Sequence, residues 1–336
     1  MIKKYIYRLI LIAPSTVKNI YFKNIKKYKI GKGVIFKKKS WIYGKDVIVE
    51  DNVLIGENST INGNIIHIGK RSVLDNDVKI IAAKSIQIGS DCYCGKFVTI
   101  AGGQTRHSQL ILGNRVKIFE NTFINTSRKV TIEDDVGIGG RCLIFTHGTW
   151  QNTYKGYPYK FGDVTIRKNA WLPWQVFVMP GIEIGENATI GSCSVILKDI
   201  PSNCFAGGFP AKVLKEKGAH VKNNDKTKHS VLSEILKEVT LDYNFFNNEN
   251  YVFNKENMSI SLNGKNVVQL NNTSKRGALS SETLLLYDKQ EDLNYPNQIN
   301  LNNNMAVIGN TSVFSHALID MLSNYGIRIQ RVNKNV

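Results

Sequence analysis

The chain has 336 residues, enough for one large domain or two ordinary ones, and its formal net charge at pH 7 is +17. Hydrophobic residues make up 42% of it and charged residues 21%, a balance that excludes an intrinsically disordered chain. No apolar run reaches the roughly 18–20 residues that a membrane-spanning helix needs, so a cytoplasmic protein is expected.

The positive charge is concentrated at the N-terminus. Residues 1–45 contain thirteen Lys or Arg and no Asp or Glu. Residues 1–29 are predicted to form a basic cap in which apolar residues recur at helical spacing, although Pro14 interrupts the pattern. Such a segment suits an anionic partner, which would be a membrane surface, an anionic polymer or nucleic acid. It equally suits a solubilising cap on an apolar core.

From Ile30 onward an aliphatic residue recurs every six positions, which is neither a helical period nor plain strand alternation. A short strand plus a turn has this length, and three such units close a triangular coil whose corners stack in one column. The expected corners are Ile30, Phe36, Ile42; Val49, Ile55, Ile61; Ile68, Leu74, Ile80; Ile88, Cys94, Ile100; Leu112, Ile118, Ile124; Ile132, Ile138, Ile144; Ile166, Leu172, Val178; and Ile184, Ile190, Ile196. Every interval longer than six follows the third corner of a group, so all insertions leave the prism at one edge. Residues 30–215 are therefore predicted to form a mainly β prism.

The two longest insertions on that edge are residues 101–111 and 145–165. The second is rich in aromatic residues. Because aromatic rings stack on sugar faces, its exposed rings are candidates for binding a sugar; the alternative is that they pack the loop onto the prism or onto a neighbouring subunit. These rings are Trp150, Tyr154, Tyr157 and Tyr159. His147 lies where the loop leaves the scaffold, and a neutral imidazole is the usual general base near pH 7.

The second half of the repeat region carries motifs of a known family. They are Val130–Ile144 followed by the His147 loop, Val164–Trp171 with Met179–Gly185, and the closing run Ile190–Pro201 with Ala206–Val213. In these motifs, residues 30–215 resemble the hexapeptide-repeat acyltransferases, in particular the branch with the maltose, galactoside and xenobiotic acetyltransferases and many bacterial polysaccharide O-acetyltransferases. The resemblance implies a left-handed parallel β-helix, a homotrimer, and acetyl-CoA bound along the edge between two prisms.

The resemblance also implies roles for single residues. By it, His147 is the general base that removes the acceptor's proton, and the acetyl group is transferred directly without an acyl-enzyme. The residues that would bind acetyl-CoA are Trp171, Trp174, Ser192, Lys212 and Lys215, the two lysines at its phosphates. Asn125 lies near the place of an acceptor-binding Asn in sugar acetyltransferases, so we expect it to contact the acceptor together with the rings of the 145–165 loop.

The activity expected from these features is acetyl-CoA-dependent O-acetylation of a bacterial surface glycan (a capsule or a lipopolysaccharide O-antigen) or of its precursor. An amino-sugar N-acetyltransferase and a non-catalytic binding solenoid are the alternatives. An anionic or lipid-linked acceptor would suit the basic N-terminus, with residues 1–45 at the inner face of the membrane. No nucleic-acid partner is expected, and no metal, because the histidines lack the spacing of the related zinc enzymes. The five cysteines are too scattered for a disulfide framework.

Beyond the prism the period of six disappears. Residues 216–230 are polar and are predicted to be a linker. Residues 231–336 mix helical and strand patterns, with helices expected at Val231–Val239 and Ser312–Asn324, and are predicted to form a small α/β accessory module. We expect this module to help trimerise the protein, to hold a long acceptor or to dock a partner.

Overall fold

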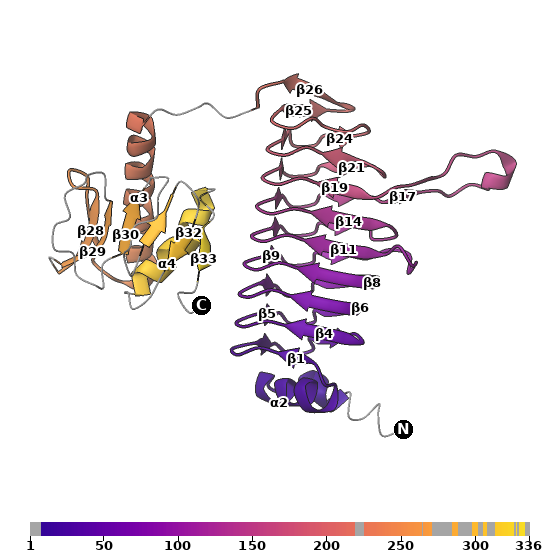
Figure 1. The fold of residues 1–336 in the computed structure, drawn as a ribbon, viewed down its shortest axis with the longest axis horizontal. Helices are drawn as coiled ribbons and strands as arrows, with labels where there is room; N and C mark the ends of the chain where they lie inside the picture. Colours follow the sequence, from indigo (N-terminus) through magenta and orange to yellow (C-terminus); the bar gives the residue numbers. More distant parts are fainter. Residues whose placement is uncertain are drawn as a thin grey trace. The chain divides into compact units, whose positions relative to one another are not determined.

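A computed structural model describes residues 8–218, 225–263, 265–270, 284–287, 298–301, 305–307, 313–325, 327 and 329–332. The chain divides into two compact units, residues 1–220 and 221–336. The first unit is a parallel β-helix with short helices at its N-terminal end, and the second contains a sheet and two α-helices (Figure 1). Each unit is described by itself below.

The β-helix has three faces, each a ladder of parallel strands from successive coils. The first face contains β1 (Lys29–Ile30), β4 (Asp46–Val49), the second halves of β6 (Thr60–Ile68) and β8 (Lys79–Ile88), β11 (Gln109–Leu112), β14 (Lys129–Ile132), β19 (Val164–Ile166) and β22 (Glu183–Ile184). The second contains β2 (Ile35–Phe36), β5 (Leu54–Ile55), β7 (Val73–Leu74), β9 (Tyr93–Cys94), β12 (Lys117–Ile118), β15 (Gly137–Ile138), β20 (Trp171–Leu172), β23 (Thr189–Ile190) and β25 (Phe205–Gly208). The third contains β3 (Trp41–Tyr43), the first halves of β6 and β8, β10 (Thr99–Ile100), β13 (Phe123–Ile124), β16 (Leu143–Ile144), β21 (Phe177–Val178) and β24 (Val195–Ile196).

The predicted fold class is confirmed, and the coils are consistent with the left-handed winding that the resemblance implies. Equivalent positions of neighbouring coils pair with each other, for example Ile138 with Leu172. The helix continues beyond the eight predicted coils, because Ile200 bridges to Ile184 and β25 adds one more strand to the second face. The last strand, β26 (Ala211–Lys215), turns back and pairs antiparallel with β25.

The edges of the prism differ in how the chain passes them. The first edge joins the first face to the second, the second edge joins the second face to the third, and the insertion edge joins the third face to the next coil. β6 and β8 run without a break round the insertion edge, and a register shift between Gly63 and Ile65 accommodates the extra residue of β8. The long insertions 101–111 and 145–165 leave from this same edge, as the spacing predicts.

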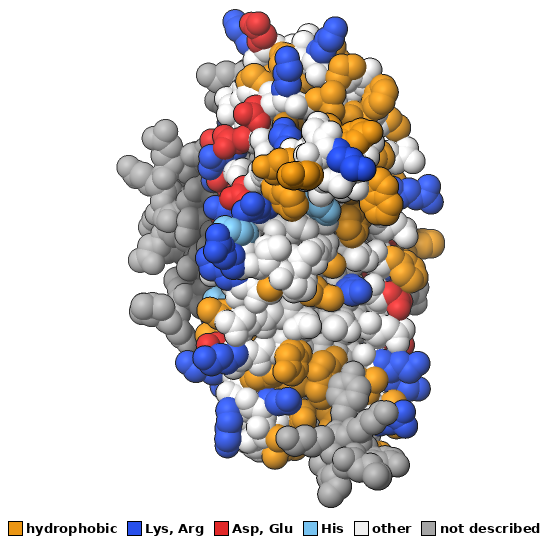
Figure 2. Space-filling view, turned by 90° about the vertical axis from the view of Figure 1, so that its right-hand side faces the viewer, with side chains coloured by type: hydrophobic (Ala, Val, Ile, Leu, Met, Phe, Trp, Pro, Cys, Tyr) orange, Lys and Arg blue, Asp and Glu red, His pale blue; other side chains and the backbone are white. Residues whose placement is uncertain are grey.

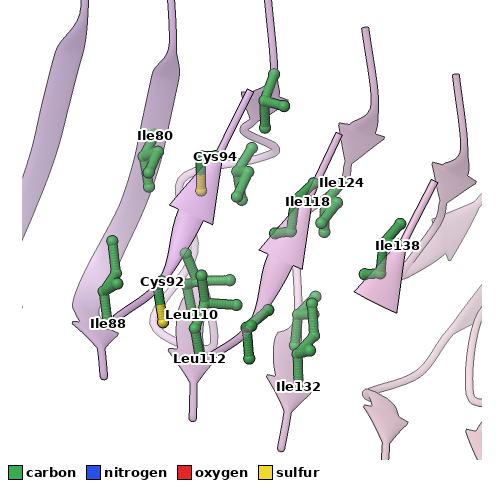
Figure 3. Close-up of a cluster of buried hydrophobic side chains, with 14 of the residues drawn as sticks. Ile80, Ile88, Cys92, Cys94, Leu110, Leu112, Ile118, Ile124, Ile132 and Ile138 are labelled. Atoms are coloured by element: carbon green, nitrogen blue, oxygen red, sulfur yellow. The ribbon is translucent and has the colours of Figure 1, made fainter. Parts of the chain in front are cut away.

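The interior is a column of aliphatic side chains. All 24 predicted corners are buried, with exposed fractions between 0% and 8%. Figure 3 shows part of the column, in which Ile118 of β12, Ile124 of β13 and Ile138 of β15 face inward together with Cys92 and Cys94. Burial raises the pKa of the Cys92 thiol to about 12. Four of the five cysteines are buried, whereas Cys193 is exposed, so burial cannot be expected of every cysteine in the repeat.

Tight turns at the first and second edges have a fixed backbone form. The third residue after a corner adopts φ near +60°, a conformation that favours Gly, Asn and Asp. The non-glycine residues in this position are Lys39, Asn52, Asn58, Arg71, Asp77, Asp91, Phe97, Arg115, Asn121, Asp135, Arg141, Asn169, Gln175, Asn187 and Cys193. The repeat therefore contains a turn signal as well as an apolar signal.

Side chains of the first edge pair from one coil to the next. Arg71 makes two bonds of 2.7 Å to Asp91, and Arg115 bonds Asp135 at 2.6 and 2.7 Å. Farther along the edge, Asn169, Asn187 and Asn203 form an amide ladder with spacings of 3.1 and 2.9 Å. Arg167 is 2.8 Å from both Glu133 and Glu183. These arginines are therefore neutralised within the prism.

The predicted N-terminal helical cap is confirmed for the described residues. It contains helical residues 8–12, α2 (Ser15–Ile20) and a π-helical turn (Tyr21–Ile25) below the first coil (Figure 1). The buried Phe22 ring packs 4.8 Å from Phe36 and 5.3 Å from Trp41, centroid to centroid, which joins the cap to the core. The cap therefore covers the apolar end of the column.

The cap also buries a lysine. The Lys18 side chain is fully buried, and its ammonium donates to the carbonyl oxygens of Lys37 and Ser40. Burial without a carboxylate partner lowers the pKa of Lys18 to about 8. The folded state therefore loses this proton more readily than the unfolded state does.

We expect Lys18 to make stability depend on pH. Between about pH 8 and the normal lysine pKa near 10.4, the unfolded chain holds a proton that the folded chain has released, so the Lys18 contribution to the free energy of unfolding rises with pH. Urea unfolding of the wild type and of Lys18→Met at pH 7 and pH 9.5 measures it. The wild type should gain stability relative to the variant at the higher pH, whereas a constant difference would contradict the prediction.

The second unit contains a mixed seven-stranded sheet. Its strands, in spatial order, are β27 (Val252–Asn254), β28 (Ser259–Leu262), β29 (Lys265–Leu270), β30 (Leu284–Tyr287), β31 (Gln298–Asn300), β32 (Met305–Val307) and β33 (Gln330–Val332). The helices are α3 (Asp225–Asn247) and α4 (Val313–Leu322), whose buried residues Leu236 and Leu318 belong to the core of this unit. α3 begins inside the predicted linker 216–230 and is longer than predicted, because its polar first turns lack the apolar spacing that marks Val231–Val239.

Two features are absent from the described residues. None of the helices in these ranges is both long and apolar enough to cross a bilayer. The same part of the chain contains no group of three His, Cys, Asp or Glu side chains that could hold a metal ion.

Candidate functional site

The structure places His147 at the base of a hairpin on the insertion edge. The hairpin is formed by β17 (His147–Gly148) and β18 (Lys160–Phe161), and it projects from the prism (Figure 1). His147 lies opposite Phe161 in this pair, and the two rings stack with centroids 5.6 Å apart. His147 is half-buried, so the imidazole is held on one side and accessible on the other.

One imidazole nitrogen of His147 is fixed by a buried amide. Its Nδ1 lies 3.1 Å from Oδ1 of Asn125, a residue of the preceding coil. The same atom accepts the backbone N–H of Ser127 at 3.0 Å, which identifies it as the amide oxygen. Because that oxygen only accepts, Nδ1 of His147 must carry the proton when the ring is neutral. Nε2 then has a free lone pair, as a general base requires.

Asn125 thus contacts His147 directly. It is 5% exposed, and Thr146 Oγ1 lies 2.8 Å from its Oδ1. The sequence predicts that Asn125 binds the acceptor; the structure places its oxygen on His147, a positioning role that the sequence did not indicate. The contact joins residues 22 positions apart in neighbouring coils, and only the three-dimensional register of the coils reveals it.

We expect Asn125→Ala to lower kcat by about tenfold or more, because the imidazole would lose the acceptor that selects its tautomer and orientation. Asn125→Asp retains the acceptor and adds a negative charge, so it should keep more activity and shift the acidic limb of the pH–rate profile to higher pH. Steady-state kinetics across pH 5–9 would test both. Identical profiles for Asn125→Asp and the wild type would contradict the positioning role.

The predicted acceptor-binding rings lie along the projecting hairpin. Trp150 is 96% and Tyr154 98% exposed, and Tyr157 and Tyr159 are also exposed. A short 3₁₀-helix (Thr153–Lys155), capped by Asn152, shapes the tip. The alternative that Trp150 and Tyr154 pack onto their own prism is therefore wrong. The two alternatives that remain for these rings are contact with a sugar and contact with a neighbouring subunit.

The predicted acetyl-CoA residues lie elsewhere on the prism. Trp174 and Ser192 are exposed in turns of the second edge, and Trp171 is exposed on the second face beside it. The Trp174 ring covers Gly140, where a Cβ would lie 2.5 Å from the ring. Lys212 and Lys215 are exposed on β26.

Within one prism, these residues and His147 are separated by the third face. His147 leaves from the insertion edge, whereas Trp174 and Ser192 lie at the second edge. The described residues of one chain thus bring His147, Asn125 and Phe161 together but do not bring the predicted acetyl-CoA residues to them. Phe161 was missed from the sequence because no pattern indicates which residue faces His147 across a hairpin.

Comparisons with known proteins confirm the resemblance. Residues 46–82 match the hexapeptide repeat of succinyl-transferase. The galactoside O-acetyltransferase of Escherichia coli (strain K12) is 33% identical over 128 residues, which cover 35% of this chain and 59% of that protein. A putative acetyltransferase of Saccharomyces cerevisiae is 34% identical over 112 residues, which cover 32% of this chain and 57% of that protein. The chain thus spans less than two thirds of the length of both relatives.

A solved structure is also similar to this chain. It is a galactoside acetyltransferase in complex with coenzyme A, 26% identical, with 42% of this chain and 70% of that chain covered and a TM-score of 0.35. A serine acetyltransferase of Synechococcus elongatus is also similar, 30% identical over 135 residues, which cover 38% of this chain and 52% of that protein. The acceptors in these names therefore differ, a galactoside in one and serine in the other, although both names are those of acetyltransferases.

Proposed function

We propose that this hexapeptide-repeat protein is an acetyl-CoA-dependent O-acetyltransferase whose general base is His147. The observation that carries the proposal is the contact of His147 Nδ1 with the amide oxygen of Asn125, which leaves Nε2 free to accept a proton. The relatives named as acetyltransferases support the reaction class. The acceptor we propose is a hydroxyl of a bacterial surface glycan or its precursor.

The chemistry requires little beyond that base. His147 takes the proton of the acceptor hydroxyl as the oxygen attacks the acetyl thioester, and the thiolate leaves. Backbone N–H groups near the site would stabilise the oxyanion. Cys142 does not serve as a nucleophile in this scheme, because its side chain is fully buried and burial raises its thiol pKa to about 11. Transfer without an acyl-enzyme follows.

The separation of the two groups of residues supports a site between copies of the chain. Exposed tryptophans at the second edge and cationic lysines on β26 suit a long, phosphate-bearing co-substrate, but they lie away from His147 in one prism. A homotrimer would bring the second edge of one prism to the insertion edge of the next. The exposed rings of the hairpin would then contact the acceptor or the neighbouring subunit.

The direct test is release of free thiol from acetyl-CoA with a panel of neutral sugars, acidic sugars and amino sugars. Release that depends on a hydroxyl acceptor supports the proposal. Release only with an amine acceptor would favour the amino-sugar N-acetyltransferase. Absence of acetyl-CoA binding would favour a non-catalytic solenoid.

We also propose that the N-terminal cap contacts an anionic membrane surface. Its side chains Leu9, Ile12, Ile20 and Ile25 are between 57% and 68% exposed, and no acidic residue occurs among the lysines of residues 1–45. Apolar side chains beside cations suit insertion at a lipid interface.

Sedimentation with vesicles would measure this contact. The protein should bind vesicles with one third phosphatidylglycerol and not pure phosphatidylcholine, and Ile20→Ser/Ile25→Ser should bind more weakly because less apolar surface is inserted. The exposed pair Val252→Ser/Val313→Ser, in the second unit, is the matched control. Equal binding to both vesicle types would contradict the proposal.

A further inference from the structure

A group of cations surrounds the base of the His147 hairpin on the insertion edge. Arg128 lies over the Phe161 ring, 5.4 Å from its centroid, and Phe161 stacks on His147. Arg106 donates to Nε2 of His107 at 3.0 Å. Lys84, Arg106 and Arg128 all act on His107 and, after desolvation, lower its pKa. Figure 2 shows Lys and Arg side chains gathered beside histidine at mid-height on the left of this side of the prism.

These cations differ from the arginines of the first edge. Arg71, Arg115 and Arg167 are each paired with a carboxylate of a neighbouring coil. Among the described residues, Lys84, Arg106 and Arg128 have no salt bridge within 4 Å; Asp163 is the acidic group near them. Their positive charge is therefore not neutralised within the prism.

Hydrogen bonds between neighbouring coils hold the backbone segments that carry this cluster. The Ser127 hydroxyl accepts the N–H of Gly103, and the Thr105 hydroxyl donates to the Ser127 carbonyl at 2.9 Å. The N–H of Arg128 donates to Thr146, the neighbour of His147. The carbonyl oxygen of Ser108 accepts the backbone N–H of Lys84 at 2.9 Å. Three coils thus hold the three cations beside one another.

The cluster lies on one side of His147 along the prism axis. Lys84, Arg106 and Arg128 belong to coils that precede the His147 coil, whereas the residues proposed for acetyl-CoA belong to coils that follow it. Coils stack in sequence order, so the cations and the proposed acetyl-CoA residues are on opposite sides of His147 along the prism axis. The space beside the cations is then left for the acceptor.

We propose that Lys84, Arg106 and Arg128 bind an anionic group of the acceptor, a carboxylate or a phosphate. The inference rests on the proposed acetyl transfer, because the anion is assigned to the acceptor only if His147 is the general base. Guanidinium groups favour bidentate contact with both kinds of anion. The acceptor is thereby assigned to the acidic glycans or the phosphorylated glycan precursors.

Binding of a fluorescent trigalacturonate, measured by anisotropy, tests the site without turnover. The wild type should bind it at least tenfold more tightly than its methyl ester, and Arg106→Gln/Arg128→Gln should lose at least tenfold. The matched control, Lys70→Gln/Lys168→Gln, removes the same charge from first-edge turns and should change binding less than twofold. Equal binding of acid and ester, or equal losses in both variants, would overturn the proposal in favour of net charge alone.

Two further arms identify the anion and separate this proposal from the enzyme assignment. If galactose 1-phosphate competes more strongly than galacturonate, the site binds a phosphate. The opposite order would indicate a carboxylate. Weaker acetyl-CoA binding in Arg106→Gln/Arg128→Gln would assign the cluster to the co-substrate and overturn the inference. If anion binding depends on the arginines but no acceptor causes thiol release, the anion site is supported and the acetyltransferase assignment is contradicted.

Discussion

Replacing His147 by alanine is expected to lower the rate of acetyl transfer by a factor of about 10²–10⁴, the range usual for loss of a general base. The fold should not change, because His147 is half-exposed at the base of a projecting hairpin and contributes no buried core surface. The measurement is thiol release under saturating acetyl-CoA, together with the melting temperature of each protein.

His67→Ala is the matched control. His67 is also a partly exposed histidine on the prism, but it bonds Glu50 at 2.8 Å and lies three coils before the hairpin. Its loss should leave the rate within twofold. A twofold loss for His147→Ala as well would exclude His147 as the base, and a large loss for His67→Ala would show that the assay reports folding.

Gly139→Ala is expected to destabilise the prism by about 3 kcal/mol or more. A Cβ at this position would lie 2.5 Å from the carbonyl carbon of Pro173 and 2.7 Å from the Trp174 nitrogen, which are backbone atoms of the next coil. The coils would have to separate, and overpacking that forces backbone shifts typically costs about 1–3 kcal/mol and occasionally more. Urea unfolding monitored by circular dichroism measures the change.

The control for Gly139→Ala occupies the same place in the repeat. Gly191 also follows a second corner, but a Cβ there would meet its nearest neighbour at 3.5 Å, an ordinary contact. Gly191→Ala should therefore change the free energy of unfolding by less than about 1 kcal/mol. If both variants unfold at the same urea concentration, close approach of the coils is not the reason for glycine at this position.

The prism could be predicted because its physics is local and repeated. Each corner such as Ile118 or Ile138 makes the same contact with the coil before and after it, so a single period determines burial, register and the edge for insertions. The N-terminal cap and the helix–strand mixture of the second unit followed from ordinary apolar spacing. The polar beginning of α3 at Asp225 did not, since it has no apolar face to detect.

The candidate site was predicted only in part, for a physical reason. A loop aromatic or a loop histidine is visible in the sequence, but its partner is selected by how neighbouring coils align. Asn125 meets His147, and Arg128 meets Phe161, because the insertion edge stacks these segments one above another. No spacing rule within one coil contains that information.

β26 has a consequence for how the protein is made. Each coil of the prism offers bare N–H and C=O groups to the next, so during synthesis the growing end is always a template that any extended chain could join. Coils can fold in order as they leave the ribosome, each upon the one already formed. The antiparallel return of Ala211–Lys215 along β25 ends that sequence on the second face. It therefore covers the second-face edge of the last coil, where another extended chain could otherwise pair.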